Sequence, residues 1–129
     1  MSKVQIKGLA HIGIFVKDLD KSVDYYKRLG FTLDAEEQPS IRLAFMSAGN
    51  CLIELVEQKD LPKREAGVVD HVAMVVEDIE AAIVSAKANG IEITGEIGEV
   101  PILGGVKNVF FDGPDGERLE FFEYCCKCQ

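Results

Sequence analysis

The sequence contains little positive charge. Its 129 residues include 14 Lys and Arg but 22 Asp and Glu, which gives a formal net charge of −8 at pH 7. Proteins bind nucleic acids and anionic membrane surfaces through clusters of positive charge. The composition therefore predicts that neither nucleic acid nor a membrane is a partner of this protein.

Long apolar runs and a disulfide-forming pattern of cysteines are also missing. The longest uncharged apolar run, Val72 to Val76, is far too short to cross a bilayer. Lys3 and Lys7 interrupt the start, where a signal peptide needs an apolar core. Cys51 stands alone, and the other three cysteines form a Cys-Cys-Lys-Cys stretch at 125–128, which does not staple a small secreted fold. These features predict a reduced, cytoplasmic protein with free thiols.

The sequence does contain an internal repeat. GLAHIGIFVKDLDKSVDYYKRLGF and VVDHVAMVVEDIEAAIVSAKANGI align without a gap, so that His11 matches His71 and Gly30 matches Gly90, each 60 residues apart. Two copies are too few for a solenoid. The repeat therefore predicts one structural module used twice within a single domain, 1–129.

Each copy predicts the order strand, helix and three strands. The first strand, 6–16 or 68–76, is rich in β-branched residues and runs into an Asp that can cap a helix, which ends at Leu29 or Asn89 before a Gly. Further strands are expected at 32–37, 42–47 and 51–57, and at 91–96, 106–111 and 118–123. Module one is thus expected over 4–57, a linker over 58–67, module two over 68–124 and a tail over 125–129.

Four potential metal ligands occupy equivalent places in the two copies. His11 and His71 are expected on the first strands, and Glu54 and Glu120 on the last. Because side chains alternate along a strand, all four should point away from the face that the helix covers. A pseudo-twofold pairing of the modules would bring them together. Two imidazoles and two carboxylates suit a divalent ion such as Ni²⁺, Co²⁺, Fe²⁺, Mn²⁺ or Zn²⁺.

Each of these residues taken alone also has an ordinary structural explanation. A His on a strand is usually a hydrogen-bonded structural residue, and a Glu on a strand is usually solvated. However, the chain has two histidines in all, and they fall on matching repeat positions. This coincidence favours the metal site.

Four motifs resemble one known superfamily. They are HIGIFVKDLDKSVDYYKRLGF, the IEL of 53–55, DHVAMVVEDIEAA and DGPDGERLEFFE. Over Gly8 to Tyr124 the chain resembles the vicinal oxygen chelate superfamily, which includes glyoxalase I, methylmalonyl-CoA epimerase, fosfomycin resistance enzymes, extradiol dioxygenases and bleomycin-binding proteins. The resemblance implies an α+β fold in which two tandem βαβββ modules form a cupped, incomplete eight-stranded barrel around the metal. Its ligand positions fall on His11, Glu54, His71 and Glu120.

The presence of all four ligands narrows the choice within the superfamily. Bleomycin-binding members do not need these ligands, and the dioxygenases use two His and one carboxylate. Two carboxylates on a divalent ion suit proton transfer next to a carbonyl, through an enediolate that the ion stabilises. The resemblance therefore implies a lactoylglutathione lyase of the glyoxalase I type, with Ni²⁺ or Zn²⁺ expected before the other metals.

The same resemblance implies a substrate and roles for the carboxylates. The substrate would be the hemithioacetal of methylglyoxal with a thiol, and the product an S-lactoyl thioester. Glu120 would be the main base and Glu54 its counterpart. Related enzymes commonly carry an Arg for the glutathione carboxylate where this chain has Phe15, so the thiol is left open.

Two alternatives remain open beside the lyase. An epimerase resembling methylmalonyl-CoA epimerase shares the opening HIGIFVKDL and the acidic stretch 36–38, in which Glu37 would be a second base. The short linker argues against it. The other alternative is a binding module that does no chemistry, but such a module would be expected to lack some of the four ligands. A thiol transferase of the fosfomycin resistance type is disfavoured, because its potassium loop is not found in the sequence.

Several features carry weaker expectations. Arg42 and Lys107 are candidate contacts for an anionic substrate, and the loop 98–105, rich in Gly and Pro, is a candidate lid. The ten residues of the linker span at most about 35 Å, which permits pairing of the modules within one chain or between two. We expect a homodimer.

Overall fold

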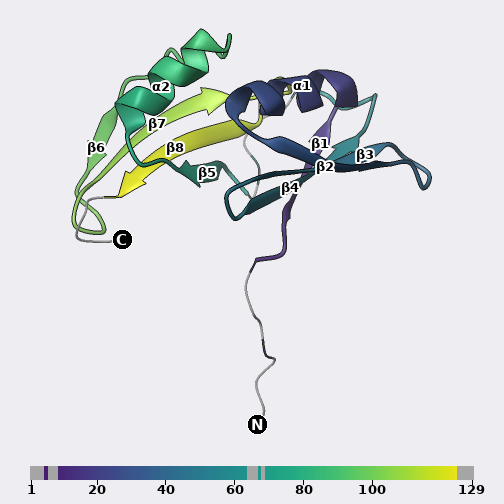
Figure 1. Ribbon diagram of the computed structural model, residues 1–129, viewed down its shortest axis with the longest axis horizontal. Coiled ribbons are helices and arrows are strands. Elements are labelled where there is room, and N and C mark those ends of the chain that lie inside the picture. The colour runs from purple at the N-terminus through teal and green to yellow at the C-terminus, as the bar shows by residue number, and fades with distance from the viewer. Residues whose placement is uncertain (1–4, 6–8, 64–66, 68, 125–129) are drawn as a thin grey trace.

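A computed structural model of the chain shows two modules of similar topology (Figure 1). It describes all residues except 1–4, 6–8, 64–66, 68 and 125–129. The expected tail with its three cysteines therefore lies outside the described residues, as do the start of the first expected strand and parts of the linker. No helix in the described part of the chain is long and apolar enough to cross a membrane.

The first module forms a four-stranded sheet with one helix. Its elements are β1 (Ile12–Val16), α1 (Leu19–Leu29), β2 (Thr32–Glu37), β3 (Leu43–Ala48) and β4 (Cys51–Glu57). The strand order is β1-β4-β3-β2, in which β1 runs parallel to β4 and the other neighbours are antiparallel. The last strand thus lies in the interior of the sheet, beside the first.

The second module repeats this arrangement. Its elements are β5 (Val72–Val75), α2 (Ile79–Ala88), β6 (Gly98–Val100), β7 (Val106–Asp112) and β8 (Arg118–Tyr124). The strand order β5-β8-β7-β6, with β5 parallel to β8, is that of the first sheet. The structure therefore confirms that the sequence repeat is one βαβββ module used twice.

Both helices begin and end where the sequence signals predict, to within a residue. The carboxylates of Asp18 and Asp78 each accept a hydrogen bond of 3.1 Å from the backbone N–H three residues later, as N-caps do. Each helix is followed by a glycine with positive φ, 123° at Gly30 and 79° at Gly90. A residue with a Cβ rarely adopts such a conformation, which explains why both helices stop there.

The two helices lie on the same side of the molecule, each over its own sheet (Figure 1). The core between helix and sheet is apolar in both modules. Leu19 of α1 and Leu55 of β4 are fully buried in the first module, and Ile79 of α2 and Leu119 of β8 are fully buried in the second. In the described residues no helix covers the opposite faces of the sheets. Those faces are where the candidate ligands are expected.

Hydrogen bonds from α1 join the two modules. The hydroxyl of Tyr26 donates to Oε2 of Glu117 at 2.9 Å, and that of Tyr25 donates to the backbone carbonyl of Asp112 at 3.2 Å. Arg28 donates to the backbone carbonyls of Asn89 and Gly90, which directly follow α2. The helix of module one is thus anchored against the β7–β8 turn and α2 of module two.

Three sequence expectations about the strands are wrong in detail. His11 and His71 do not lie on strands but directly before them, because pairing with β4 and β8 begins one residue later. The strand expected at 91–96 is not found there. The edge strand of the second sheet is instead β6 (Gly98–Val100), which lies within the segment 98–105 that was expected to be a loop. Ile91 and Ile93 are buried, which produces the strand-like pattern. At Gly95 a Cβ would lie 2.9 Å from the carbonyl oxygen of Phe110, so the chain passes close to β7 without pairing regularly with it.

Candidate metal centre

The first His–Glu pair lies on the face of the first sheet that α1 leaves uncovered. His11 directly precedes β1, and Glu54 lies in the middle of β4, the strand paired with β1. The neighbours Ile53 and Leu55 are buried in the core, so Glu54 points to the other face. Nε2 of His11 lies 3.7 Å from Oε1 of Glu54.

The second pair occupies the equivalent place in the second sheet. His71 directly precedes β5, and Glu120 lies on β8 between the buried residues Leu119 and Phe121. Nε2 of His71 lies 3.2 Å from Oε1 of Glu120. The Glu120 side chain is 5% exposed, whereas that of Glu54 is 23% exposed. Both pairs are therefore built in the same way, and the second is the more deeply enclosed.

An aromatic ring supports each histidine. Phe45 meets the ring of His11 edge-on at 5.7 Å, and Phe110 meets that of His71 at 5.4 Å. These two phenylalanines pair across the sheet with Glu54 and Glu120, respectively. Each half of the chain thus holds a matched set of imidazole, carboxylate and phenyl groups.

The geometry of each pair fits two adjacent ligands of one divalent ion. Donors bound side by side at about 2.0 to 2.2 Å from an ion lie about 3 to 3.5 Å apart, close to the observed 3.2 and 3.7 Å. Imidazole and carboxylate donors suit Ni²⁺, Zn²⁺ and their neighbours. In the described residues of one chain, however, no three His, Cys, Asp or Glu side chains are grouped closely enough to hold an ion. The structure brings each His to its Glu and leaves the two pairs apart.

Two polar residues that sequence reasoning missed hold the second pair. Oδ2 of Asp70 lies 2.8 Å from Nδ1 of His71, and the amide of Asn108 donates to Oε2 of Glu120 at 2.8 Å. The contact with His71, together with the charge of Arg118, holds the pKa of Asp70 below its usual value. The Nδ1–H tautomer of His71 would donate to this carboxylate and leave Nε2 to bind a metal. Strand alternation could have predicted the position of Asn108, because it lies two residues before Phe110 and therefore on the same face of the sheet.

Arg118 extends this network. Its guanidinium donates to Oδ2 of Asp70 at 2.9 Å and lies 4.0 Å from the centre of the Phe110 ring. It therefore joins the carboxylate behind His71 to the ring beside it. A cavity of about 380 Å³ at the boundary of the modules is lined by Asp70, His71 and Arg118 of module two and by Gly13 of β1.

Comparison with known proteins identifies the family. The model of the Glyoxalase/Bleomycin resistance protein/Dioxygenase superfamily matches residues 8–121. The chain belongs to this superfamily. The resemblance seen in the motifs is thereby confirmed, and so is the α+β fold of paired βαβββ modules. In the described residues the two sheets stay separate and close no barrel.

Relatives within the superfamily carry the names of different enzymes. The chain is 34% identical over 125 residues to the lactoylglutathione lyase of Escherichia coli O157:H7, covering 89% of this chain and 91% of that one. It is 30% identical over 118 residues to the mitochondrial methylmalonyl-CoA epimerase of Homo sapiens, covering 82% and 66%. A solved glyoxalase family protein from Enterococcus faecalis matches with a TM-score of 0.79 at 28% identity, covering 91% and 98%.

Two further candidate residues, Phe15 and Glu37, lie on the face of the first sheet that carries the His11–Glu54 pair. Phe15 follows Gly13 by two residues on β1 and is 52% exposed. Glu37 ends the edge strand β2 and pairs with Leu43, which shares a face with Phe45. Phe15 and Glu37 are therefore directed to the side of the sheet where a substrate would bind, and their contacts with one remain predictions.

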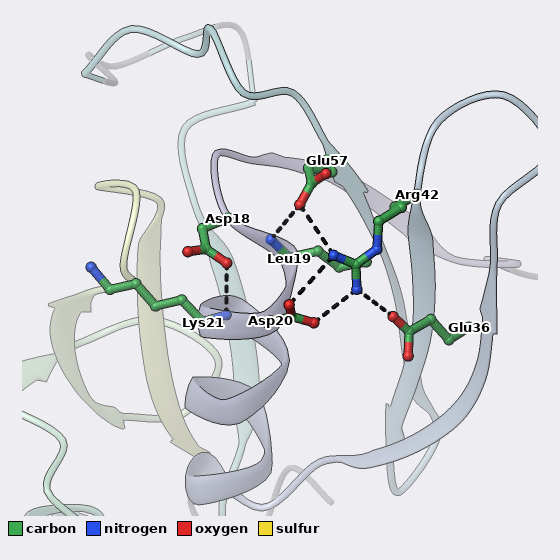
Figure 2. Close-up of polar contacts among 7 residues, drawn as sticks. All are labelled: Asp18, Leu19, Asp20, Lys21, Glu36, Arg42 and Glu57. Carbon is green, nitrogen blue, oxygen red and sulfur yellow. Dashed lines mark hydrogen bonds and ion pairs between the residues drawn. The ribbon is translucent and has the colours of Figure 1, made fainter.

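The two candidate cations lie elsewhere. Arg42 faces three carboxylates on the α1 side of the sheet, at 2.8 Å from Asp20, 2.7 Å from Glu36 and 3.8 Å from Glu57 (Figure 2). These charges raise the pKa of Arg42 further above its already high value. Lys107 is adjacent to Asn108 on β7, so alternation places it on the α2 side. The structure does not bring either cation to the His–Glu pairs.

Proposed function

We propose that this protein is a metal-dependent lyase of the glyoxalase I type, which converts the hemithioacetal of methylglyoxal and a thiol to an S-lactoyl thioester. The observation that carries the proposal is the pair of equivalent His–Glu sets, His11 with Glu54 and His71 with Glu120, each spaced as two ligands of one ion. The name of the lactoylglutathione lyase relative supports this choice of reaction. Ni²⁺ and Zn²⁺ are the metals we expect.

We further propose that a second copy of the chain completes the site. Each pair supplies two donors, and a six-coordinate ion needs more protein ligands than two to be held firmly. Exposed apolar side chains also flank the histidines at equivalent positions, Leu9 (80% exposed) and Phe15 (52%) near His11, and Val69 (77%) and Val75 (65%) near His71. An exposed apolar patch is typical of a surface that a partner covers.

In such a homodimer the pair His11–Glu54 of one chain would face the pair His71–Glu120 of the other. A twofold axis would then create two identical sites, because a symmetric dimer uses the same surfaces on both copies. The repeated topology of the two sheets supports this arrangement, since each module presents its pair in the same orientation.

The proposed chemistry is an isomerisation by proton transfer. When bound, a divalent ion polarises oxygen atoms of the substrate and so makes the neighbouring C–H acidic. A carboxylate, Glu54 or Glu120, removes the proton from the carbon that carries sulfur and returns it to the former carbonyl carbon. The hydroxyl proton passes from the first oxygen to the second, so that the hydroxyl and the carbonyl exchange places. R–S–CH(OH)–CO–CH₃ thereby becomes R–S–CO–CH(OH)–CH₃. The atoms and electrons balance, and no external oxidant or reductant is needed.

The surroundings of the site leave the thiol open. Phe15 is an apolar side chain, and it offers no charge to a carboxylate of the cosubstrate. We propose that the thiol is chosen by contacts other than an ion pair at position 15.

An epimerase acting on a CoA thioester is the second candidate. One specific observation favours it, because Glu37 shares the face of the first sheet on which Glu54 lies. An epimerase needs two bases on opposite sides of one carbon, and Glu37 is a candidate for the second. The relative named methylmalonyl-CoA epimerase supports this alternative.

A thioester assay separates the two candidates. The protein is loaded with Ni²⁺ or Zn²⁺ and given methylglyoxal with a panel of thiols that includes glutathione. A variant with Ser in place of Cys125, Cys126 and Cys128 controls for metal bound by those thiols. Metal-dependent formation of the thioester with one of the thiols is the expected result. Absence of thioester with every thiol and both ions contradicts the lyase, and exchange of the α-hydrogen of a CoA thioester with solvent would then support the epimerase.

A further inference from the structure

Each module places a carboxylate from its last strand at the first turn of its helix. Oε2 of Glu57 accepts a hydrogen bond of 3.0 Å from the backbone N–H of Leu19 (Figure 2), and Oε1 of Glu123 accepts one of 2.8 Å from the backbone N–H of Ile79. Glu57 and Glu123 therefore occupy equivalent places on the helix side of their sheets, opposite the face that carries the His–Glu pairs. The surroundings of these two carboxylates can be compared directly.

In the first module a guanidinium fills this place. Arg42, the residue before β3, lies 3.8 Å from Glu57, 2.7 Å from Glu36 and 2.8 Å from Asp20 (Figure 2). Three carboxylates of the chain itself therefore surround the cation. No external group is needed to balance its charge.

The equivalent residue of the second module, Lys107, makes no such contacts. When the modules are aligned on the phenylalanines beside the histidines, Lys107 falls on Arg42. It is paired across the strands with Glu99 of β6 on one side and with Glu123 of β8 on the other. Among the described residues, however, Lys107 forms no ion pair with either carboxylate or with any other. Its side chain is half-buried, so water solvates the ammonium group only in part.

These charged residues line a cavity of about 540 Å³, within the size range of small-molecule sites. The cavity thus offers one ammonium group and two carboxylates. The rest of its lining carries no charge and is mostly apolar, and consists of Val100, Pro101, Gly105 and Val106. A ligand that matches this lining carries a positive group, a negative group and a short apolar part.

A ligand with a single charge matches the cavity poorly. An anion beside Lys107 would also face Glu99 and Glu123, and a cation beside the two glutamates would also face Lys107. Like charges that approach each other in a partly desolvated place repel strongly. A zwitterion instead presents each sign to its opposite, and hydrogen bonds between charged groups are the strong ones.

We propose that this cavity binds an α-amino acid with an aliphatic side chain. The carboxylate of the ligand lies at Lys107, and its ammonium group lies at Glu99 and Glu123. Residues paired across neighbouring strands are about 5 Å apart, a distance that the two charged groups on the α-carbon can bridge. The aliphatic side chain packs against Val100 and Val106. This site goes beyond the proposed function, because it lies on the α2 side of the second sheet and uses none of the candidate metal ligands.

The first test compares three probes with one carbon skeleton. L-Leucine carries both charges, 4-methylpentanoate lacks the ammonium group, and 3-methylbutylamine lacks the carboxylate. Each is titrated into the metal-free full-length protein at constant ionic strength, and the backbone amide signals are followed by two-dimensional NMR. We expect leucine to shift the amides of 99–101, 105–107 and 123 with a Kd that is roughly millimolar for a ligand of this size.

The two analogues should bind roughly 10-fold more weakly than leucine, or worse, because each has lost one set of hydrogen bonds between charged groups. Equal binding of either analogue overturns the zwitterion. The absence of saturable shifts with leucine, or shifts confined to other parts of the chain, overturns the site.

The second test separates charge from fit at one position. Lys107→Met removes the charge and should weaken leucine binding roughly 10-fold or more. Lys107→Arg keeps the charge, but a guanidinium there can reach the carboxylates as Arg42 does, so this change should also weaken binding. Lys27→Met, which removes an exposed charge from α1, is the matched control and should have no effect.

Circular dichroism checks that each variant is folded, and the two changes at position 107 guard against the loss of one. Leucine binding that survives Lys107→Met overturns the proposal. An equal loss in Lys27→Met overturns it as well, because the effect would then come from the net charge of the protein. Full binding by Lys107→Arg contradicts the comparison of the two modules on which the proposal rests.

Discussion

The hydroxyl of Tyr26 in α1 donates a 2.9 Å hydrogen bond to the buried carboxylate of Glu117, the residue before β8. This bond joins the helix of the first module to the hairpin of the second, across 91 residues of sequence. Glu117 also accepts from the backbone N–H of Asp115 at 2.8 Å, which shapes the turn that leads into β8. The relative position of the two His–Glu pairs depends on such contacts between modules.

Removing this hydroxyl should lower stability without disturbing the ligands. We expect Tyr26→Phe to reduce the free energy of unfolding by about 1 to 3 kcal/mol, the usual loss when a buried charged acceptor loses its donor. Urea unfolding followed by circular dichroism measures the change, with Tyr124→Phe on the last strand as a control. A stability equal to that of the unaltered protein would show that the bond contributes nothing.

The same tyrosine should make stability fall at alkaline pH. Burial and the nearby Glu117 raise the pKa of Tyr26 well above its ordinary value. Above about pH 10 the unfolded chain loses this proton while the folded chain keeps it, so the free energy of unfolding decreases as pH rises. Below pH 10 this contribution is fully present. The decline between pH 10 and 11 should be shallower in Tyr26→Phe, and identical slopes would contradict the assignment.

Gly113 is required by the packing of the same turn. A Cβ at this position would lie 2.3 Å from Cδ of Glu117, well inside contact distance. Because that carboxylate is held by Tyr26 and by Asp115, it has little freedom to move aside. Gly113→Ala should therefore cost about 1 to 3 kcal/mol, as overpacking of an interior does. Gly49→Ala serves as a comparison, since open space surrounds its Cβ position and its positive φ of 57° supplies the only strain. A loss no larger at position 113 than at position 49 would count against the packing argument.

The sequence predicts much of this fold because its signals are local. Asp18 and Asp78 cap the helices as expected, and Gly30 and Gly90 follow them. Strand alternation also predicts that Glu54 and Glu120 point away from the face that the helix covers, and the burial of their neighbours in each strand agrees. Such patterns depend on residues close in the chain or on equivalent positions in the two copies.

Other features depend on contacts that no local pattern records. The chain before β6 passes so close to Phe110 of another strand that a Cβ at Gly95 would lie 2.9 Å from its carbonyl oxygen. Arg42 looks like a substrate contact in the sequence, yet it lies among Asp20, Glu36 and Glu57, which come from three different places in the chain (Figure 2). Long-range electrostatics decides its position.

A single histidine substitution in each of two chains tests the assembled site most directly. His11→Ala and His71→Ala proteins, carrying different tags, are coexpressed, and the mixed dimer is isolated and titrated with Zn²⁺. If the site joins the two modules of different chains, the mixed dimer contains one complete site and one that lacks both histidines. Each variant alone should bind Zn²⁺ weakly, whereas the mixed dimer should regain tight binding at about half the number of sites of the unaltered dimer. A mixed dimer that binds no more tightly than either parent contradicts a metal centre shared between His11 of one chain and His71 of the other.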